Sequence, residues 1–481
     1  MRKMLMLFAS VLIISSVFAE DYNPGADFHV DAAWNFNGDA NFSDFTVIGG
    51  HSVLAGMDFD SDSLFEVLFV IDETLAPGGP DPGKLGVYLY ESDGNGGYTH
   101  VWHFVTPDPG NSLPGMNYGD IDGDGNHEIY FGVPPSVGNN TNSWGTYIFE
   151  QGADGAFPTT PTMLWQHANG TTGLTEADNF RPSSYQVADV DGDGKNELIT
   201  TDRGMVHLSI DALAGNDLDD LATMQNEYFV GGDQSELDGG GIYDVDVVDF
   251  DGDGLHEVWV NTWDQFSMAI YEATGADAYR LANDLNQMFI DNDPGSFNRV
   301  GFAFHDIDGD GAMEAWFPMT NGKLYYLETA ADSTDSSHFA IGGVDSIKAS
   351  HFHEILTFGP PTSRGGDVGD IDGNGKPDII VGTGTAETVV RIEYQGSDPT
   401  DPFSYMVSTI LESQGGDPDR WYSLDISDND LDGDGNLEVV VPNIKGVLEG
   451  QAQILILDHY SFDWDWTGAE NGMTHLDPNW S

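Results

Sequence analysis

The sequence contains no cysteine among its 481 residues. Disulfide bonds are therefore excluded, and so is a lipid anchor attached through a cysteine. A protein that works outside the cell without disulfides needs other cross-links, and bound metal ions can provide them.

Basic residues are also scarce. The chain has 15 lysines and arginines against 81 aspartates and glutamates, and its formal net charge is −66. Such a surface repels the phosphates of nucleic acids and of anionic membranes. Neither is therefore expected as a partner.

The only long apolar run lies at the beginning of the sequence. Arg2 and Lys3 precede the apolar residues 4–14, and residues 17–19 (Val-Phe-Ala) match a cleavage site. This order predicts a signal peptide at residues 1–19 and an extracellular location for the secreted remainder. The run is too short for a stable membrane span and no later stretch is long enough, so membrane insertion is not expected.

One acidic motif is abundant. Residues 120–128 read Asp-Ile-Asp-Gly-Asp-Gly-Asn-His-Glu, with acids at positions 1, 3, 5 and 9, an apolar residue at position 2 and glycine at position 6. The pattern returns at intervals of about 60 residues, which is typical of a repeat fold. The seven copies begin at Asp58, Asp120, Asp189, Asp249, Asp306, Asp370 and Asp430.

Alternating carboxylates can converge on one point only around a cation, because several negative charges within a few ångströms repel one another. Oxygen ligands in this number are typical of Ca²⁺. We expect up to seven Ca²⁺ ions, bound by the side chains of positions 1, 3, 5 and 9 and by the backbone carbonyl of position 7. Position 2, apolar in every copy, should point away from the ion into a core. The candidate ligands are Asp58, Asp60, Asp62, Glu66, Asp120, Asp122, Asp124, Asn126, Glu128, Asp189, Asp191, Asp193, Lys195, Glu197, Asp249, Asp251, Asp253, Leu255, Glu257, Asp306, Asp308, Asp310, Ala312, Glu314, Asp370, Asp372, Asn374, Lys376, Asp378, Asp430, Asp432, Asp434, Asn436 and Glu438.

An EF-hand is the alternative interpretation, because it shares the first six positions of the motif. Its bidentate glutamate stands at position 12, where none of the seven copies has a residue that can serve. Those residues are Phe69, Phe131, Thr200, Val260, Phe317, Val381 and Val441. Position 9 also leads into β-rich runs such as residues 257–260 (Glu-Val-Trp-Val), so the loop is expected to join two strands.

The motif resembles the FG-GAP/VCBS-type repeats of integrin-α-like β-propellers, whose D-x-D-x-D-G-x-x-D loop binds Ca²⁺ in a hairpin of each blade. The resemblance covers roughly residues 52–459. It implies an all-β, seven-bladed β-propeller with one calcium loop in each blade. We place the propeller at residues 20–460, and at 461–481 a C-terminal tail that completes the last blade or contacts a partner.

Two copies depart from the family pattern. In the first, Ser63 stands where glycine belongs, so a distorted or weak site is expected there. In the sixth, Asn374 at position 5 lowers the charge by one while keeping an oxygen ligand. Six of the seven copies end in glutamate where integrins usually have aspartate, and this longer side chain can shift the geometry.

Each repeat offers four strand-like segments, as a propeller blade does. Residues 28–36 are similar to the segments that end the first two repeats, and we expect them to close the ring by joining the last blade. Residues 211–224 and 276–289 have apolar residues at helical spacing and are interpreted as helical insertions.

Three further groups of residues are candidates for chemistry. His351 and His353 would share one face of a strand, as a metal-binding or catalytic pair or as two solvated side chains. Five arginines could line the axial mouth for an anionic ligand or form local ion pairs, and three tryptophans could stack on sugar rings or pack between blades. These residues are Arg181, Arg203, Arg299, Arg364 and Arg420, and Trp144, Trp263 and Trp421.

The sequence contains no G-x-S-x-G, H-E-x-x-H or P-loop motif. We therefore expect a secreted calcium-binding propeller for adhesion or extracellular assembly, with structural Ca²⁺ and an extracellular protein, a glycan or further copies of itself as partner. The alternative is an extracellular polysaccharide-active enzyme, since similar loops occur in rhamnogalacturonan-lyase propellers. Its polyanionic substrate would face a strongly negative protein, and no catalytic base can be named.

Overall fold

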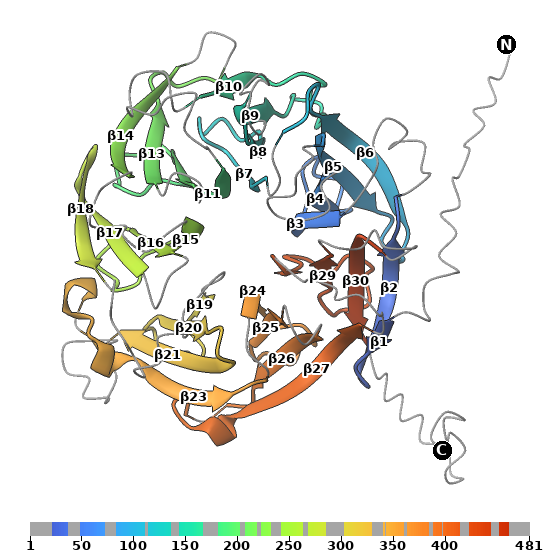
Figure 1. Ribbon diagram of the computed structural model, residues 1–481, viewed down its shortest axis with the longest axis vertical. Coiled ribbons are helices and arrows are strands. Elements are labelled where there is room, and N and C mark those ends of the chain that lie inside the picture. Colours follow the sequence, from blue (N-terminus) through green and yellow to red (C-terminus); the bar gives the residue numbers. More distant parts are fainter. Residues whose placement is uncertain are drawn as a thin grey trace, which may run out of the picture.

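The structure is a computed structural model in which the described residues form seven sheets around a central axis (Figure 1). This confirms an all-β, seven-bladed propeller. Within this described part, the only helices are the short 3-10 turns η3 (Val344–Ser346), η4 (Ala349–His351) and η5 (Pro402–Ser404). The described residues are 22–36, 49–72, 83–110, 114–135, 144–166, 181–202, 207–218, 223–231, 242–262, 268–284, 303–329, 340–341, 343–359, 363–383, 388–396, 398–413, 423–443 and 452–460.

Each of the first four blades is an antiparallel sheet whose strand order follows the chain. Blade 1 consists of β3 (Gly49–Met57), β4 (Glu66–Asp72), β5 (Leu85–Ser92) and β6 (Tyr98–Val105). Blade 2 consists of β7 (Met116–Gly119), β8 (Glu128–Val133), β9 (Gly145–Glu150) and β10 (Met163–Trp165). Blade 3 consists of β11 (Pro182–Ala188), β12 (Glu197–Asp202), β13 (His207–Leu213) and β14 (Met224–Gly231). Blade 4 consists of β15 (Ile242–Val248), β16 (Glu257–Thr262), β17 (Met268–Gly275) and β18 (Ala278–Asp284).

The last three blades depart from this plan at their outer edges. Blade 5 consists of β19 (Ala303–His305), β20 (Glu314–Pro318) and β21 (Lys323–Thr329), with β22 (Ala340–Ile341) and β23 (His353–Thr357) both paired to β21. Blade 6 consists of β24 (Ser363–Gly369), β25 (Asp378–Thr383), β26 (Thr388–Tyr394), β27 (Tyr405–Ser413) and β1 (Tyr22–Pro24). Blade 7 consists of β28 (Asp425–Ile426), β29 (Val439–Pro442), β30 (Ile454–His459) and β2 (Phe28–Trp34).

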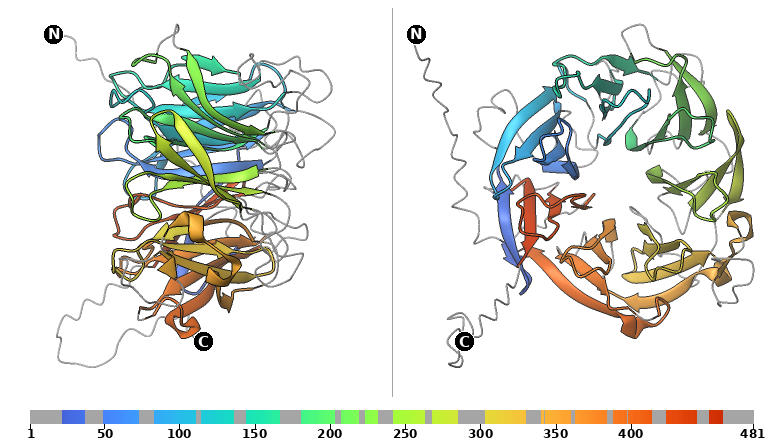
Figure 2. Two further views of the ribbon diagram at one scale, coloured as in Figure 1. Left: turned by 90° about the vertical axis from the view of Figure 1, so that its left-hand side faces the viewer. Right: turned by 180° about the vertical axis from the view of Figure 1, so that it is seen from behind.

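The N-terminal segment closes the ring. Strand β2 pairs antiparallel with β30, with Phe28 opposite His459 and Trp34 opposite Ile454, so the predicted closure is confirmed. Strand β1 pairs with β27 of blade 6, which was not predicted. Figure 2 shows these blue strands on the outside of the orange and red blades. The N-terminal segment therefore ties two blades together.

Among the described residues, the core consists of seven apolar clusters, and each lies between two neighbouring blades. Strand β4 illustrates the pattern, because its alternate residues face opposite interfaces: Val67 and Phe69 face blade 7, while Leu68 and Val70 face blade 2. Such alternation follows from the two-residue period of a strand. The fold therefore depends on side-chain contacts between blades as well as on pairing within them.

Both predicted helical insertions are wrong where the structure describes them. Residues 211–213 end β13, and Leu213 lies opposite Met224, the first residue of β14. Leu281 lies in β18, opposite Tyr271. The apolar spacing fitted a helix, but cross-strand pairing satisfies the backbone groups and buries the same side chains between blades. Residues 219–222 and 285–289 lie outside the described residues.

Candidate metal loops

Each acidic loop connects the innermost strand of its blade to the second strand, and the seven loops share one backbone conformation. The N–H of position 2 donates to the carboxylate of position 9, as from Ile121 to Glu128 (2.7 Å). The N–H of position 6 donates to the carboxylate of position 1, and that of position 7 donates to the side chain of position 5. All three hydrogen bonds occur in all seven loops.

The side chain of position 2 is buried in every loop, at the interface with the next blade, as predicted. Phe59 thus packs between blades 1 and 2, and Leu431 between blades 7 and 1. Folding of the loop and packing of the neighbouring blade are therefore directly linked. The seven residues are Phe59, Ile121, Val190, Phe250, Ile307, Ile371 and Leu431.

Positions 4 and 6 both have positive φ in every loop. Six loops place glycine there, for example Gly123 (71°) and Gly125 (90°), where an added Cβ would meet no atom within 4 Å. Backbone conformation, not space, therefore requires glycine. The first loop adopts the same conformation with Ser61 (62°) and Ser63 (69°), so the substitutions strain this loop without changing its course.

Replacing Ser63 with glycine should relieve this strain. A non-glycine residue in the left-handed region destabilises the folded state by about 1 kcal/mol or more. Glycine removes this strain, but it also increases the conformational entropy of the unfolded chain, which offsets part of the stabilisation. We expect Ser63→Gly to raise the free energy of unfolding by about 0.5–1 kcal/mol, measured by urea denaturation in excess calcium. Ser350→Gly, at an exposed position without positive φ, is the control and should not stabilise the protein. A stabilisation equal in both variants would contradict this explanation.

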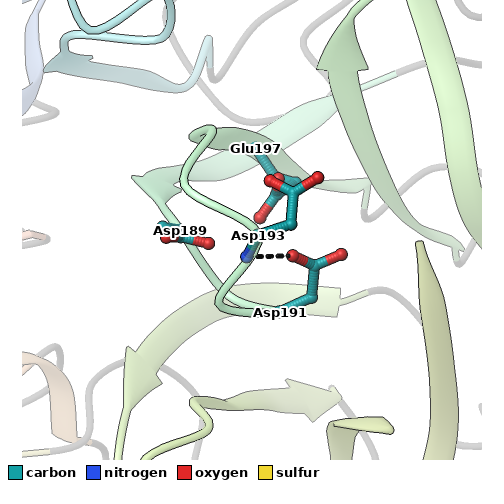
Figure 3. Close-up of side chains that lie close together, drawn as sticks. All are labelled: Asp189, Asp191, Asp193 and Glu197. Carbon is teal, nitrogen blue, oxygen red and sulfur yellow. Dashed lines mark hydrogen bonds between the residues drawn. The ribbon is translucent and has the colours of Figure 1, made fainter. Parts of the chain in front are cut away.

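The loop carboxylates gather around a common point. Figure 3 shows the third loop, in which Asp189, Asp191, Asp193 and Glu197 lie within reach of one ion. The side chain of position 9 is buried, and only one of its carboxylate oxygens accepts a hydrogen bond from the loop backbone. Its other oxygen, Oε1, makes no hydrogen bond in four loops, and Asp189, Asp249 and Asp251 each have a buried, unpartnered Oδ1. The four glutamates are Glu128, Glu257, Glu314 and Glu438.

Burial of a carboxylate without a counter-charge disfavours its ionised form. It raises the pKa of Glu128 to about 8 and that of Glu314 to about 9, with the neighbouring aspartates adding to the effect. Burial likewise raises the pKa of Asp122, at position 3 of the second loop. Burial acts on Asp372 of the sixth loop too, but hydrogen bonding and charge from Arg391 outweigh it and lower its pKa. In the other loops, a divalent cation would restore the ionised form of the carboxylates. Their ligand atoms are all oxygens, which fits Ca²⁺.

Sequence reasoning missed a further acid that faces six of the loops. It lies on the third strand of the blade, directly opposite position 9, as Glu91 lies opposite Glu66. Asp60, Glu66 and Glu91 together form a group that could hold a metal ion. Five of these acids pair directly with position 9, and in blade 7 Asp458 follows Leu457, the residue opposite Val439, whereas blade 3 has Ala212 at this place. The five are Glu91, Glu150, Glu272, Glu328 and Glu393. Their distance along the chain from position 9 varies, so only the sheet register reveals them.

The sequence profile of the FG-GAP-like repeat family matches residues 58–131, which span the first two loops and the strands between them. The other five blades have the same kind of loop between their first two strands. The chain is a β-propeller of FG-GAP-like repeats. No relative was found among curated protein sequences.

Several solved structures resemble this FG-GAP propeller at low sequence identity. The periplasmic gluconolactonase PpgL of Pseudomonas aeruginosa is 15% identical over 75% of this chain and 85% of that chain, with a TM-score of 0.45. A lectin of Agrocybe aegerita that recognises non-reducing terminal N-acetylglucosamine is 13% identical over 84% and 98%, with a TM-score of 0.42. The V. cholerae biofilm matrix protein Bap1 is 10% identical over 91% and 92%, with a TM-score of 0.31.

The candidate histidine pair of the FG-GAP propeller does not form a strand face. His351 ends η4, whereas His353 begins β23. The prediction failed because His351 belongs to a 3-10 turn and the strand begins only at His353. Their neighbour Glu354 pairs with Lys323 at 3.0 Å.

The other candidates are only partly described. Arg181 lies half-buried, and its backbone N–H donates to Asp202. Trp144 is buried, which agrees with packing between elements and not with an exposed sugar platform. The signal peptide, the tail from residue 461, Arg203, Arg299, Arg420, Trp263, Trp421 and the side chain of Arg364 lie outside the described residues. Within the described part, no helix has the length and apolarity to cross a membrane.

Carboxylates also gather near the axis of the propeller, on the innermost strands of blades 4, 6 and 7. Burial raises the pKa of Asp246 and Asp425, and charge repulsion from Asp367 adds to both shifts. Two of these acids link neighbouring blades, because Asp367 accepts from the N–H of Ile426 (2.7 Å) and Asp425 accepts from that of Ala55 (2.7 Å). The axis is therefore acidic, and its carboxylates serve the contacts between blades.

Proposed function

We propose that this chain is a secreted calcium-binding propeller, in which structural Ca²⁺ fixes the blades and the outer surface binds an extracellular protein, a glycan or further copies of the chain. The observation that supports calcium binding best is the buried Oε1 atom of position 9 in four loops. This oxygen has no hydrogen-bond partner and lies among further carboxylates. Three or four carboxylates per loop with this geometry fit the coordination number of Ca²⁺.

A binding role is supported by apolar side chains exposed on an otherwise acidic protein. Phe403 is 92% exposed, and Met406 and Val407, at the start of β27, are 49% and 40% exposed. All three residues lie within residues 403–407, and exposed apolar side chains concentrated in one segment are typical of interaction surfaces. The net charge of −66 argues against a polyanionic polysaccharide as substrate, because so negative a protein would repel it.

The test is a panel of immobilised polysaccharides and matrix proteins in calcium buffer, with retention, product release and self-association measured in parallel. We expect retention or concentration-dependent self-association that is lost in EDTA and weakened by Phe403→Ser. Val101→Ser, at a 48% exposed position on β6, is the matched control. Release of shortened or unsaturated sugars would contradict the proposal and indicate an enzyme. A protein that stays monomeric and is retained by nothing in the panel would also contradict the proposal.

A further inference from the structure

The sixth loop contains an arginine among its carboxylates. The side chain of Arg391 is buried and reaches both oxygens of Asp378: Nε lies 2.7 Å from Oδ1, and Nη2 lies 2.9 Å from Oδ2. The same Nη2 lies 2.7 Å from Oδ2 of Asp372. One guanidinium therefore contacts three oxygens from positions 3 and 9, which are the oxygens expected to bind an ion.

No other blade has a cation at this place. Arg391 lies on β26 opposite Ile380, the second residue after position 9. The same register position in the other six blades is apolar or aromatic. These residues are Leu89, Ile148, Ile210, Ile270, Tyr326 and Ile456.

The departures of the sixth loop from the motif fit the arginine. Asp378 is shorter than the glutamate at position 9 of the other loops, which leaves room for the guanidinium. Asn374 replaces the aspartate of position 5, and its Nδ2 donates to Glu393 at 3.2 Å. The backbone still follows the common course, since the N–H of Ile371 donates to Asp378 (3.1 Å). The loop thus keeps its shape with fewer negative charges and an internal cation.

We propose that Arg391 takes the place of the calcium ion in the sixth loop, so that blade 6 needs no metal and the chain binds Ca²⁺ in at most six loops. A Ca²⁺ ion would have to lie about 2.3–2.6 Å from the same oxygens, and two cations cannot share that space. Blade 6 also carries β1, so the metal-independent blade is one of the two that hold the N-terminal segment. This inference rests on the proposed function, since it assumes that the other loops bind calcium.

The test is the number of Ca²⁺ ions per chain after equilibrium dialysis in about 0.15 M salt, which screens weak surface binding. Arg391→Ile, which installs the residue found at this register in four other blades, should bind one ion more than wild type. Arg391→Lys keeps a cation there and should leave the count unchanged. No gain in Arg391→Ile, or the same gain in both variants, would overturn the inference.

A second pair of variants serves if Arg391→Ile fails to fold. Asp372→Asn should leave the count unchanged, whereas Asp122→Asn, at the same position of the second loop, should lower it by one. Equal losses in both variants would overturn the inference while leaving calcium binding intact. A wild-type chain that binds no calcium would instead contradict the proposed function, so the two failures are distinguishable.

Discussion

Removing calcium with EDTA is expected to lower the midpoint of thermal unfolding by about 10 °C or more. Each ion held at a free concentration of about 100 times its Kd contributes about 2.7 kcal/mol to stability, and several sites contribute together. The structure adds a second reason. Loop residues such as Phe59 and Leu431 pack in the interfaces between blades, so a loop that loses its ion also loosens the contact with the next blade.

The side chain of position 3 also links some loops to the next blade by a hydrogen bond. Asp122 accepts a hydrogen bond from Leu218 of blade 3 (2.8 Å), and Asp251 accepts one from Val344 of blade 5 (3.2 Å). Unfolding should therefore become less cooperative in EDTA, as the blades separate. Magnesium should restore only part of the stability, because it gives up its waters reluctantly. Equal melting curves in calcium and in EDTA would refute a structural role for the ion.

Trp34→Ala is expected to lower the free energy of unfolding by about 3–5 kcal/mol, as large core truncations do. Trp34 lies on β2 in blade 7 and packs against Phe69, Tyr90 and Tyr98 of blade 1, with ring centroids 5.0–5.6 Å apart. This tryptophan therefore occupies the interface at which the ring closes. Its loss leaves a cavity between the first and last blades, and it weakens the anchoring of β2, which is joined to the rest of blade 7 only by pairing with β30.

Urea denaturation in excess calcium measures this effect, because saturated loops then contribute equally to wild type and variant. Leu164→Ala on β10 is the control, since Leu164 is 37% exposed and should matter little. A cost for Trp34→Ala no larger than that of the control would show that the Trp34 side chain does not stabilise the interface between blades 7 and 1.

Most of the fold could be predicted from the sequence because one local pattern is repeated. In each acidic loop, the positive φ of positions 4 and 6 favours glycine, and the burial of position 2 favours an apolar residue. The same constraints apply in every blade, so the sequence pattern is repeated. The sequence also predicted that residues 28–36 would close the ring, and β2 does so. The two predicted helices failed because apolar spacing alone does not reveal the distant strand against which a segment pairs.

The acids and the arginine that face the loops could not be predicted by spacing. Glu91 and Glu393 reach their loops across a sheet, so their role follows from register and not from sequence distance. Arg391 was visible in the sequence as part of a strand, but its burial against Asp378 requires the folded blade. The calcium assignments themselves remain predictions, and what supports them is the buried oxygens of position 9.

The most direct test of this account is anomalous diffraction from crystals grown with calcium. We expect difference peaks about 2.3–2.6 Å from the carboxylate oxygens in the loops of blades 2, 3, 4, 5 and 7, and no peak beside Arg391. Crystals that contain calcium but show no peak in those five loops would contradict the account at its centre.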